Sequence, residues 1–535
     1  MKRTVAATLL SLCIAAQTAA QGLKSGRYEL PYKNTYVKEV FVAENEYRTA
    51  APERIEPRPF DEARGILPAP YWEGHDKEIE MYWHAWRIAV GNIRQPQEGS
   101  GFVSPYLDMA YNGNIFMWDM SFMMLYARYG YRYFPFQRSM DNFYAKQHPD
   151  GFICREIRAD GSDCFERYDP TSTGPDLLPW IELTYFRQFG DIDRLHRIFP
   201  ALCGYAKWWK LNRTWPDGTY WSSGWGTGMD NMPRVKPEYN PIFSHGHMVW
   251  LDTNLQQMLV DESLLQIGFH IERWQEIEWM EEEMKMLKRY INEHLWDERD
   301  GFLHDRYGDG SLCPTKGIGA YWALQTDALD KERLDRLVAH LSDTTEFARP
   351  HRVPSLSADH AKYNPVGRYW QGGVWPGTNY MVIDGLWRKG YRAQAREIAA
   401  NHYASVFEVW KKTGTFWEYY APERPEPGFM ARKDFVGWTG LPPIAVFIEY
   451  VLGIKSDYSE RRIEWDVTRI EAHGIERYPF GPNGVVDLKV RRRGSSSEVP
   501  AVTVSTDVPF DLTVLWGDGQ SRTVHVEKSG EVKLD

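Results

Sequence analysis

The segment at residues 273–295, RWQEIEWMEEEMKMLKRYINEHL, shows most clearly which kind of fold this chain adopts. Met280, Met284, Leu287 and Ile291 recur at three- and four-residue spacing, and most of the acidic residues between them fall on the other side. Side chains three and four positions apart lie on one face of an α-helix. The spacing therefore predicts an amphipathic helix with one buried and one solvated face.

Similar helical patterns recur along most of the chain and are separated by long loops rich in Gly, Pro and aromatic residues. About a dozen helices without alternating strands argue against βαβ units and favour helical hairpins arranged as a toroid, with the long loops forming its binding face. Besides 273–295, the predicted helices cover residues 77–90, 117–129, 177–189, 195–209, 252–267, 331–342, 374–387, 392–410 and 442–451.

The pattern changes after about residue 459. Residues 485–490, 501–505 and 511–515 alternate apolar and polar side chains, with turn signals at 494–496 and 517–519. Such alternation is typical of half-buried strands. We therefore predict a mainly α protein with a helical domain at 66–457 and a small C-terminal antiparallel β-module at 460–535.

Composition and charge narrow the possible partners. The 63 basic and 73 acidic residues are mixed along the chain, the net charge is -10, and no basic block could follow a phosphate backbone. Nucleic acid is therefore not an expected partner, and after the N-terminus no apolar run reaches the roughly 18 residues of a membrane span. The 23 Trp and 31 Tyr exceed what a core requires, so we expect some rings to face a ligand.

The N-terminus is typical of a secretory signal. Lys2 and Arg3 precede an apolar run at residues 5–16, and small residues follow just before Gln21. We predict a signal peptide at 1–20, cleaved near Ala20, followed by an arm at 21–65 and a periplasmic or secreted location. Leu12 directly before Cys13 disfavours a lipoprotein.

Four cysteines remain after removal of the predicted signal: Cys154, Cys164, Cys203 and Cys313. An oxidising compartment would allow Cys154 and Cys164 to bridge a short hairpin, with the free and bridged forms both left open. The spacing of Cys and His residues predicts no structural zinc site, and we expect no metal in the catalytic site and no redox cofactor. Whether a calcium ion stabilises one of the loops is left open.

Two carboxylates stand out by their aromatic surroundings. Asp230 lies in GMDNMPR, residues 228–234, which follows a run of tryptophans, and Glu418 lies in TFWEYYAP, residues 415–422. Hydrolysis of a glycosidic bond needs one carboxyl group to protonate the leaving oxygen and another to activate water. An Asp followed by Asn and Pro can also simply form a turn, and a lone Glu can be a surface residue. The aromatic flanks favour a ligand-binding cleft for both.

These residues carry a resemblance to a known family. The segment SGWGTGMDNMPR at 223–234 resembles the acid motif of glycoside hydrolase family 63 and its trehalase-like and mannosylglycerate-hydrolase-like relatives. The resemblance continues in RYWQGGVWP at 368–376, WEYYAPE at 417–423 and FVGWTG at 435–440, with weaker matches at 116–119 and 147–152. Together these motifs cover most of residues 70–455.

The resemblance implies an (α/α)6 barrel that hydrolyses α-glycosidic bonds with inversion. It places the general acid on Asp230 and the general base on Glu418. We expect desolvation by neighbours such as Trp225 to raise the pKa of Asp230, and a polar, water-accessible position to keep Glu418 ionised. The residues expected to contact the oligosaccharide or glycoside substrate are Trp118, Asp119, Gln147, Trp225, Arg234, Tyr369, Trp370, Gln371, Trp375, Trp417 and Trp438.

Two departures from the family pattern leave substrate choice open. Gly226 and Thr227 stand where the acid motif usually opens with Glu and Ser, and Tyr419-Tyr420 replaces the common Asn-Tyr after the base. The expected substrate is a terminal α-linked glucosyl or mannosyl residue. The alternatives are a polysaccharide lyase or sugar epimerase on the same helical toroid, and a carbohydrate-binding protein without activity.

Overall fold

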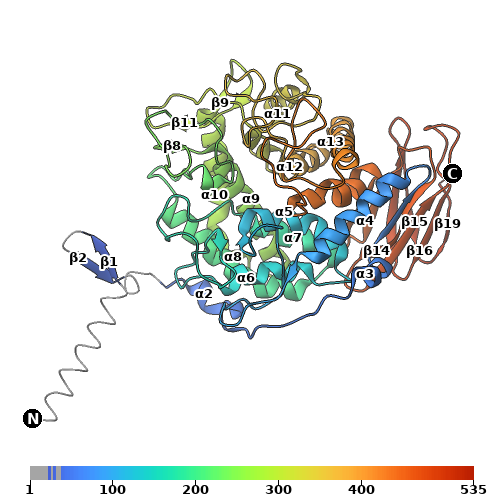
Figure 1. Cartoon of the computed structure of the whole chain (residues 1–535), viewed down its shortest axis with the longest axis horizontal. Coiled ribbons are helices and arrows are strands. Elements are labelled where there is room, and N and C mark those ends of the chain that lie inside the picture. The colour runs from blue at the N-terminus through green and yellow to red at the C-terminus, as the bar shows by residue number, and fades with distance from the viewer. Residues whose placement is uncertain (1–21, 26–27, 32–37, 535) are drawn as a thin grey trace, which may run out of the picture.

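Six well-buried helical segments form an inner ring in the computed structural model, which describes residues 22–25, 28–31 and 38–534. Each segment contacts the next in chain order, and the last contacts the first, so the ring closes (Figure 1). The segments are α5 (Met117–Ala127), α7 (Leu178–Phe189), α9 (Leu251–His270), the 3-10 helix η8 (Ile318–Gln325), α12 (Pro376–Arg388) and the π-helix η11 (Leu441–Val451).

Outer helices precede each inner segment along the chain and complete six helical hairpins. The outer helix α10 is amphipathic: it buries Met280 and Leu287 and exposes most of its charged residues. This arrangement agrees with the predicted (α/α)6 toroid, and each of the ten predicted helices overlaps a helical segment. The outer helices are α4 (Asp76–Gly91), α6 (Asp141–Ala145), α8 (Ile192–Asn212), α10 (Trp279–Tyr290), α11 (Lys331–Ala339) and α13 (Arg392–Thr413).

Local sequence signals set several helix ends. The Asp191 side chain accepts a hydrogen bond from the Arg194 backbone N–H at 3.0 Å and caps α8. The preceding helix α7 ends at Gly190, whose φ of 68° is the left-handed conformation that glycine adopts most readily. Pro376 opens α12, where its missing N–H and fixed φ cost nothing. Gly190 and Asp191 thereby make a tight connection from the inner helix α7 to the outer helix α8, and Pro376 marks where the long loop before α12 ends.

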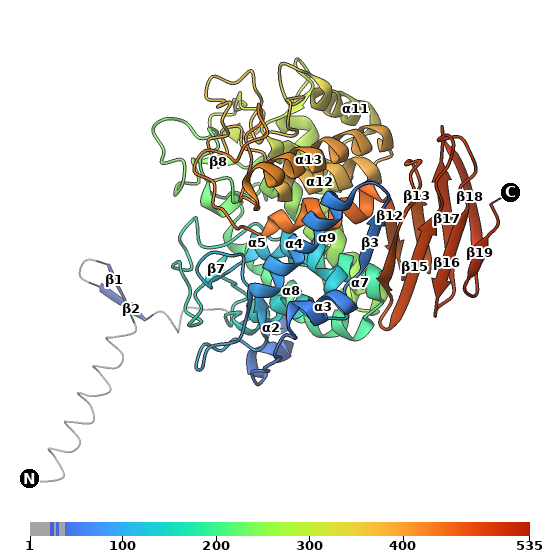
Figure 2. The same ribbon diagram turned by 45° about the vertical axis from the view of Figure 1, so that its right-hand side comes forward.

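The C-terminal region consists of two sheets that pack face to face (Figure 2). Phe480 of one sheet meets Phe510 of the other with ring centroids 5.5 Å apart. The strands of the first sheet, in spatial order, are β19 (Gly530–Val532), β16 (Val502–Thr506), β15 (Gly484–Val490), β14 (His473–Phe480) and β3 (Ala69–Trp72). Those of the second are β12 (Ile454–Asp457), β13 (Arg462–Asp466), β17 (Phe510–Trp516) and β18 (Gln520–Val526).

Two features of these sheets differ from the predicted antiparallel module. Strand β13 pairs with β17 in parallel, Ile463 opposite Leu512. The edge strand β3 comes from residues 69–72, at the start of the helical domain, and pairs with β14. The alternation of a single strand determines which face is buried but not which distant strand lies beside it, so neither pairing could be predicted from sequence.

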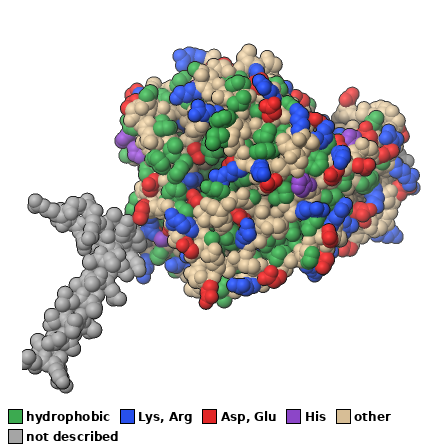
Figure 3. Space-filling view, viewed as in Figure 1, with side chains coloured by type: hydrophobic (Ala, Val, Ile, Leu, Met, Phe, Trp, Pro, Cys, Tyr) green, Lys and Arg blue, Asp and Glu red, His purple; other side chains and the backbone are tan. Residues whose placement is uncertain are grey.

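The described part of the N-terminal arm lies on the outside of the helical body. Helix α2 (Val40–Glu44) packs on α8 and buries Phe41, and the chain then runs along the surface to α3 (Phe60–Ile66) (Figure 1). The predicted signal peptide, with Cys13, lies outside the described residues. On the face shown in Figure 3, acidic and basic side chains are interspersed. No helix within residues 38–534 has the length and apolar character to cross a membrane.

The four described cysteines are all free, so the bridge considered between Cys154 and Cys164 is not formed. The hairpin itself is present, since Ile157 pairs with Asp163. Cys164 donates its backbone N–H to the Glu156 carbonyl at 3.0 Å. It therefore lies opposite Glu156, whereas Cys154 comes two residues earlier in the chain.

Candidate active site

Asp230 and Glu418 line the same cavity, of about 290 Å³, at the end of the ring where the inner helices α5 and α12 begin. The structure thus brings together the two carboxylates predicted from sequence. Beside them, six of the predicted substrate-contacting residues line the cavity: Trp118, Asp119, Trp225, Tyr369, Trp370 and Trp438.

The loop that carries Asp230 is held close to Trp118 by a glycine. Gly228 has a φ of 73°, and a Cβ added there would lie 2.7 Å from the Trp118 ring. Any larger residue would push this loop away from the indole. On the other side, the Asn231 Oδ1 accepts the Trp370 backbone N–H at 2.8 Å, and its Nδ2 donates to the Arg368 carbonyl at 3.2 Å. The acid loop is therefore fixed between two aromatic segments.

Burial raises the pKa of Asp230 to about 6, because a carboxylate loses hydration among these rings. The Arg155 guanidinium and a hydrogen bond from the Tyr369 hydroxyl act in the opposite direction and limit the rise. Tyr369 is held in the left-handed backbone region, with a φ of 60°, which is uncommon for a residue with a side chain. The carboxyl group thus titrates near neutral pH, as a general acid requires.

Glu418 is less accessible than expected. The residue is only 8% exposed, and burial raises its pKa. It still lines the cavity, so water can reach it there, but its position is more enclosed than expected. Arg432 opposes the shift: its guanidinium Nε lies 4.0 Å from the Glu418 Oε2, and its backbone N–H donates to the same oxygen at 3.4 Å. The neighbouring Trp438 fixes the backbone by donating its Nε1–H to the Glu418 carbonyl at 2.6 Å.

Asp119, in the first turn of α5, has a higher pKa than Asp230. Burial raises it to about 8, and the nearby Glu418 and Asp230 add to the rise, while Arg155 lowers it. At neutral pH Asp119 is therefore mostly protonated. A protonated carboxyl group can donate one hydrogen bond and accept others, which suits contact with a sugar hydroxyl.

Stacked aromatic rings support one wall of the cavity. Trp118 and Trp370 lie at an angle of 56° to each other, with centroids 5.9 Å apart. Behind them, Trp375 stacks on Trp370 at 4.2 Å and on Tyr419 at 4.3 Å. Trp375 is buried and does not line the cavity, contrary to the prediction, because both of its faces are covered by other rings. It positions Trp370 instead.

Four other predicted substrate contacts also lie outside the cavity. Their polar groups bind protein atoms. Gln147 donates to the carbonyls of Gly151 and Ala201 and accepts from Asn45 of the arm. Arg234 is buried in ion pairs with Asp252 and Asp305 at 2.7 and 2.6 Å.

Gln371 donates to the Asn231 carbonyl at 3.2 Å and so fixes the acid loop. Trp417 donates its Nε1–H to the hydroxyl of Thr413, the last residue of α13, at 3.0 Å. Alternate residues of an extended segment point in opposite directions. A sequence motif therefore brings its backbone close to the cavity, but only some of its side chains line the cavity.

Arg155 lines the cavity and lowers the pKa of Asp230, but it was not predicted from the sequence. It adjoins strand β7 (Glu156–Ile157), which pairs with β6 (Ile115–Phe116) directly before α5. Its guanidinium lies over the rings of Phe165 and Trp225, at 5.0 and 5.6 Å. Among the described residues its buried Nε has no hydrogen-bond partner. The other unpredicted lining residues are Met109, Tyr111, Asn112, Phe116, Glu156, Phe165, Gly228 and Arg432.

The replacement of glutamate by Gly226 in the acid motif has a steric basis. A Cβ at Gly226 would lie 2.5 Å from the Ser222 Oγ, so no larger residue fits without a shift. Thr227 donates its hydroxyl to the Gly224 carbonyl at 3.0 Å and closes the turn. Gly226 and Thr227 thus form the turn before Gly228, and with these residues in place both carboxylates line the cavity.

Paired carboxyl groups between aromatic walls, at one end of a ring of helical hairpins, define a class of protein: the glycoside hydrolases with a helical toroid. The model of the mannosylglycerate hydrolase MGH1-like glycoside hydrolase domain matches residues 114–439. The chain belongs to this family, and the predicted resemblance to glycoside hydrolase family 63 is confirmed.

Relatives and solved structures agree with this assignment. The chain is 24% identical over 281 residues to a probable mannosyl-oligosaccharide glucosidase of Schizosaccharomyces pombe, covering 46% of this chain and 34% of that protein. It is 26% identical over 162 residues to a mannosylglycerate hydrolase of Rubrobacter radiotolerans, covering 30% and 35%. The alignments thus span roughly a third of each relative.

The fold is similar to that of a GH63 mannosylglycerate hydrolase from Thermus thermophilus in complex with glucose. The TM-score is 0.55 at 17% identity, and the match covers 69% of this chain and 99% of that one. This likeness shows a shared helical fold.

Proposed function

We propose that this protein is an exported, inverting glycoside hydrolase that removes a terminal α-linked glucosyl or mannosyl residue. The observation that carries the proposal is the pair Asp230 and Glu418 in one cavity walled by tryptophan rings. The names of its relatives, a mannosyl-oligosaccharide glucosidase and a mannosylglycerate hydrolase, support the two sugars.

In this proposal Asp230 is the general acid and Glu418 the general base. A pKa of about 6 leaves Asp230 partly protonated near neutral pH, so that it can give its proton to the leaving glycosidic oxygen. Glu418, held by Arg432, takes a proton from the water that attacks the anomeric carbon from the opposite side. Trp118 and Trp370 offer flat faces to the apolar side of the sugar ring, and Asp119 is placed to bind its hydroxyls.

The stereochemistry of the product tests inversion directly. We expect an NMR time course on an α-linked disaccharide to show the β-anomer of the released sugar first, because water attacks opposite the bond that breaks. Immediate release of the α-anomer would contradict an inverting mechanism. Release of no sugar from a panel of α-linked glucosides and mannosides would favour a carbohydrate-binding protein.

The two arginines of the cavity make a prediction about pH dependence. The acid works protonated, so activity falls as pH rises through the pKa of Asp230; the base works ionised, so activity rises with pH through the pKa of Glu418. Arg155 lowers the pKa of Asp230, and Arg432 lowers that of Glu418. We expect Arg155→Met to move the alkaline limb of the kcat profile to higher pH and leave the acid limb in place.

Arg432→Met is the matched variant and should have the complementary effect. Without the cation beside Glu418, the pKa of the base rises, and the acid limb of kcat moves to higher pH. The measurement is kcat as a function of pH for both variants and the unmodified enzyme. If Arg155→Met shifts the acid limb alone, the roles of the two carboxyl groups are reversed.

Export is part of the proposal and rests on the residues before Gln21. Expression of the full chain in a bacterial host should yield a periplasmic or secreted protein that begins near Gln21. Mass determination of the intact N-terminus measures this, and a cytoplasmic protein that retains residues 1–20 would disprove export.

A further inference from the structure

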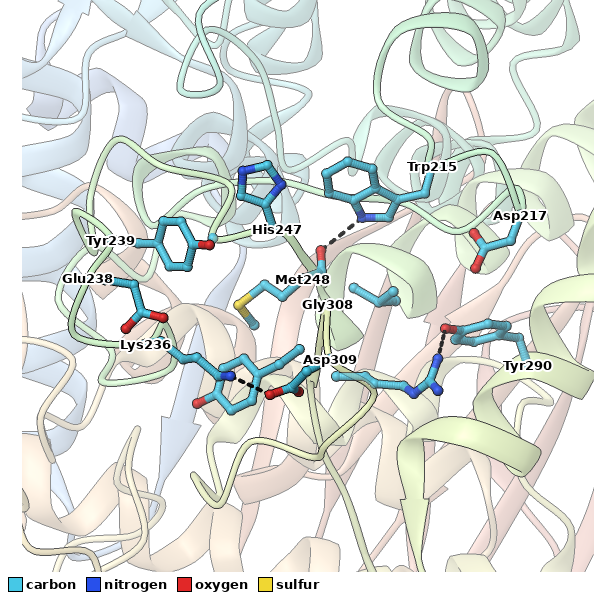
Figure 4. Close-up of a pocket in the computed structure, with 14 residues that line it drawn as sticks. Trp215, Asp217, Lys236, Glu238, Tyr239, His247, Met248, Tyr290, Gly308 and Asp309 are labelled. Carbon is cyan, nitrogen blue, oxygen red and sulfur yellow. Dashed lines mark hydrogen bonds and ion pairs between the residues drawn. The ribbon is translucent and has the colours of Figure 1, made fainter.

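A second and larger hollow, of about 540 Å³, is lined by the residues drawn in Figure 4. Its floor is the pairing of β8 (Met248–Val249) with β11 (Arg306–Tyr307). None of its lining residues lines the cavity of Asp230 and Glu418. They are Trp215, Asp217, Lys236, Glu238, Tyr239, Gly246, His247, Met248, Val249, Tyr290, Arg306, Tyr307, Gly308 and Asp309.

Aromatic side chains surround this hollow, and protein contacts fix their orientation. The half-buried Trp215 donates its Nε1–H to the Met248 carbonyl at 3.0 Å, and its ring lies nearly parallel to that of His247, at 6.2 Å. Tyr307 donates its hydroxyl to the Arg234 carbonyl at 3.0 Å. Tyr239 packs against His247, with centroids 5.5 Å apart. Rings held in place without a ligand lose little entropy on binding one.

The polar groups of the hollow favour a neutral ligand that carries hydroxyl groups. Its carboxylates are those of Asp217, Glu238 and Asp309, and its cations are already engaged: Lys236 pairs with Asp309 at 2.6 Å, and Arg306 donates to the Tyr290 hydroxyl at 2.9 Å. Glu238 has no hydrogen-bond or ion-pair partner among residues 38–534. Carboxylates accept hydrogen bonds from hydroxyls and repel an anionic ligand.

From the rings and the free acceptor together we infer that this hollow is a secondary binding site for a neutral hexose unit of an oligosaccharide. Apolar sugar faces would lie on Trp215 and Tyr239, and hydroxyls would donate to Glu238. That the ligand is an α-linked hexose oligosaccharide rests on the proposed function. Binding of a sugar in the hollow does not depend on catalysis.

One loop connects the two sites. Residues 235–247 follow the acid motif and supply Lys236, Glu238, Tyr239 and His247 to the hollow. The same loop places Phe243 against Trp225 of the catalytic cavity, with centroids 5.0 Å apart. Residues 235–247 therefore lie between the hollow and the catalytic cavity. A ligand in the hollow would contact the same loop that packs against Trp225.

Saturation-transfer NMR with maltotriose tests the site, on full-length protein that carries Asp230→Asn to prevent turnover and Trp118→Ala to weaken binding in the catalytic cavity. We expect Tyr239→Ala and, separately, Glu238→Gln to raise the Kd of the hollow about two- to tenfold and to reduce the transferred signal. Phe269→Ala is the matched control, because Phe269 is a surface ring, 72% exposed, at the end of α9. It should leave the signal unchanged.

Activity separates this inference from the proposed function. In protein that retains Asp230, neither hollow variant should alter the KM for a small aryl α-glycoside, which fills only the catalytic cavity. If Tyr239→Ala removes the transferred signal but the unmodified protein hydrolyses no glycoside, the secondary binding site is supported and the proposed hydrolase function is refuted. Unchanged transfer in the double variant Glu238→Gln/Tyr239→Ala, or no transfer in the parent protein, would overturn the site.

Discussion

Asp230→Asn is expected to lower kcat for an unactivated α-linked disaccharide by about 10²–10⁴-fold, the usual contribution of a general acid. The amide keeps the size of the carboxyl group and can still accept the hydrogen bond from Tyr369, but it cannot supply a proton to the leaving oxygen. A glycosyl fluoride needs no such proton. Its turnover should therefore fall far less, and the ratio of the two losses measures the acid role by steady-state kinetics.

A buried aspartate elsewhere in the chain controls for loss of folding. Asp176, just before α7, also has a pKa raised by burial, to about 7, and lies outside the cavity. Asp176→Asn should change the turnover of disaccharide and fluoride in parallel and only modestly. Equal losses on disaccharide and fluoride in Asp230→Asn would mean that Asp230 positions the substrate without donating a proton.

Helix positions and the two carboxylates could be predicted from sequence because each depends on a local signal. The apolar spacing around Met280 and Leu287 defines a buried face, and the outer helix α10 buries that face. Asp230 and Glu418 were identifiable because their neighbours combine glycine, proline and aromatic residues in a recurring order. Gly228 shows the physical basis of that order, since only glycine allows the acid loop to approach Trp118.

The direction in which a side chain points could not be predicted in the same way. Arg234 and Gln147 lie in or beside motif segments, yet their partners, Asp305 and Asn45, come from distant parts of the chain. Arg155 has no motif and reaches the cavity only because β7 pairs with β6. Such contacts depend on tertiary pairing, for which a single sequence carries no local signal.

Glu418→Gln is expected to lower turnover of both the disaccharide and the fluoride, by about 10²–10⁴-fold, because water must be activated whatever the leaving group. This distinguishes it from Asp230→Asn. The glutamine can still accept the Arg432 backbone N–H, which reaches the Glu418 Oε2 at 3.4 Å, so the loop should keep its shape. Glu423→Gln is the matched control: Glu423 lies in the same loop as Glu418, pairs with the distant Arg349 and lies outside the cavity.

Azide provides a second readout for the base. It is a nucleophile that needs no deprotonation, and it can occupy the position of the attacking water once the negative charge of Glu418 is removed. Glu418→Gln with an α-glycosyl fluoride and azide should therefore give a β-glycosyl azide, detectable by NMR, whereas Asp230→Asn should gain nothing on the fluoride. Undiminished hydrolysis by Glu418→Gln would exclude the base role, and an α-configured azide would show that the nucleophile enters on the side of the leaving group.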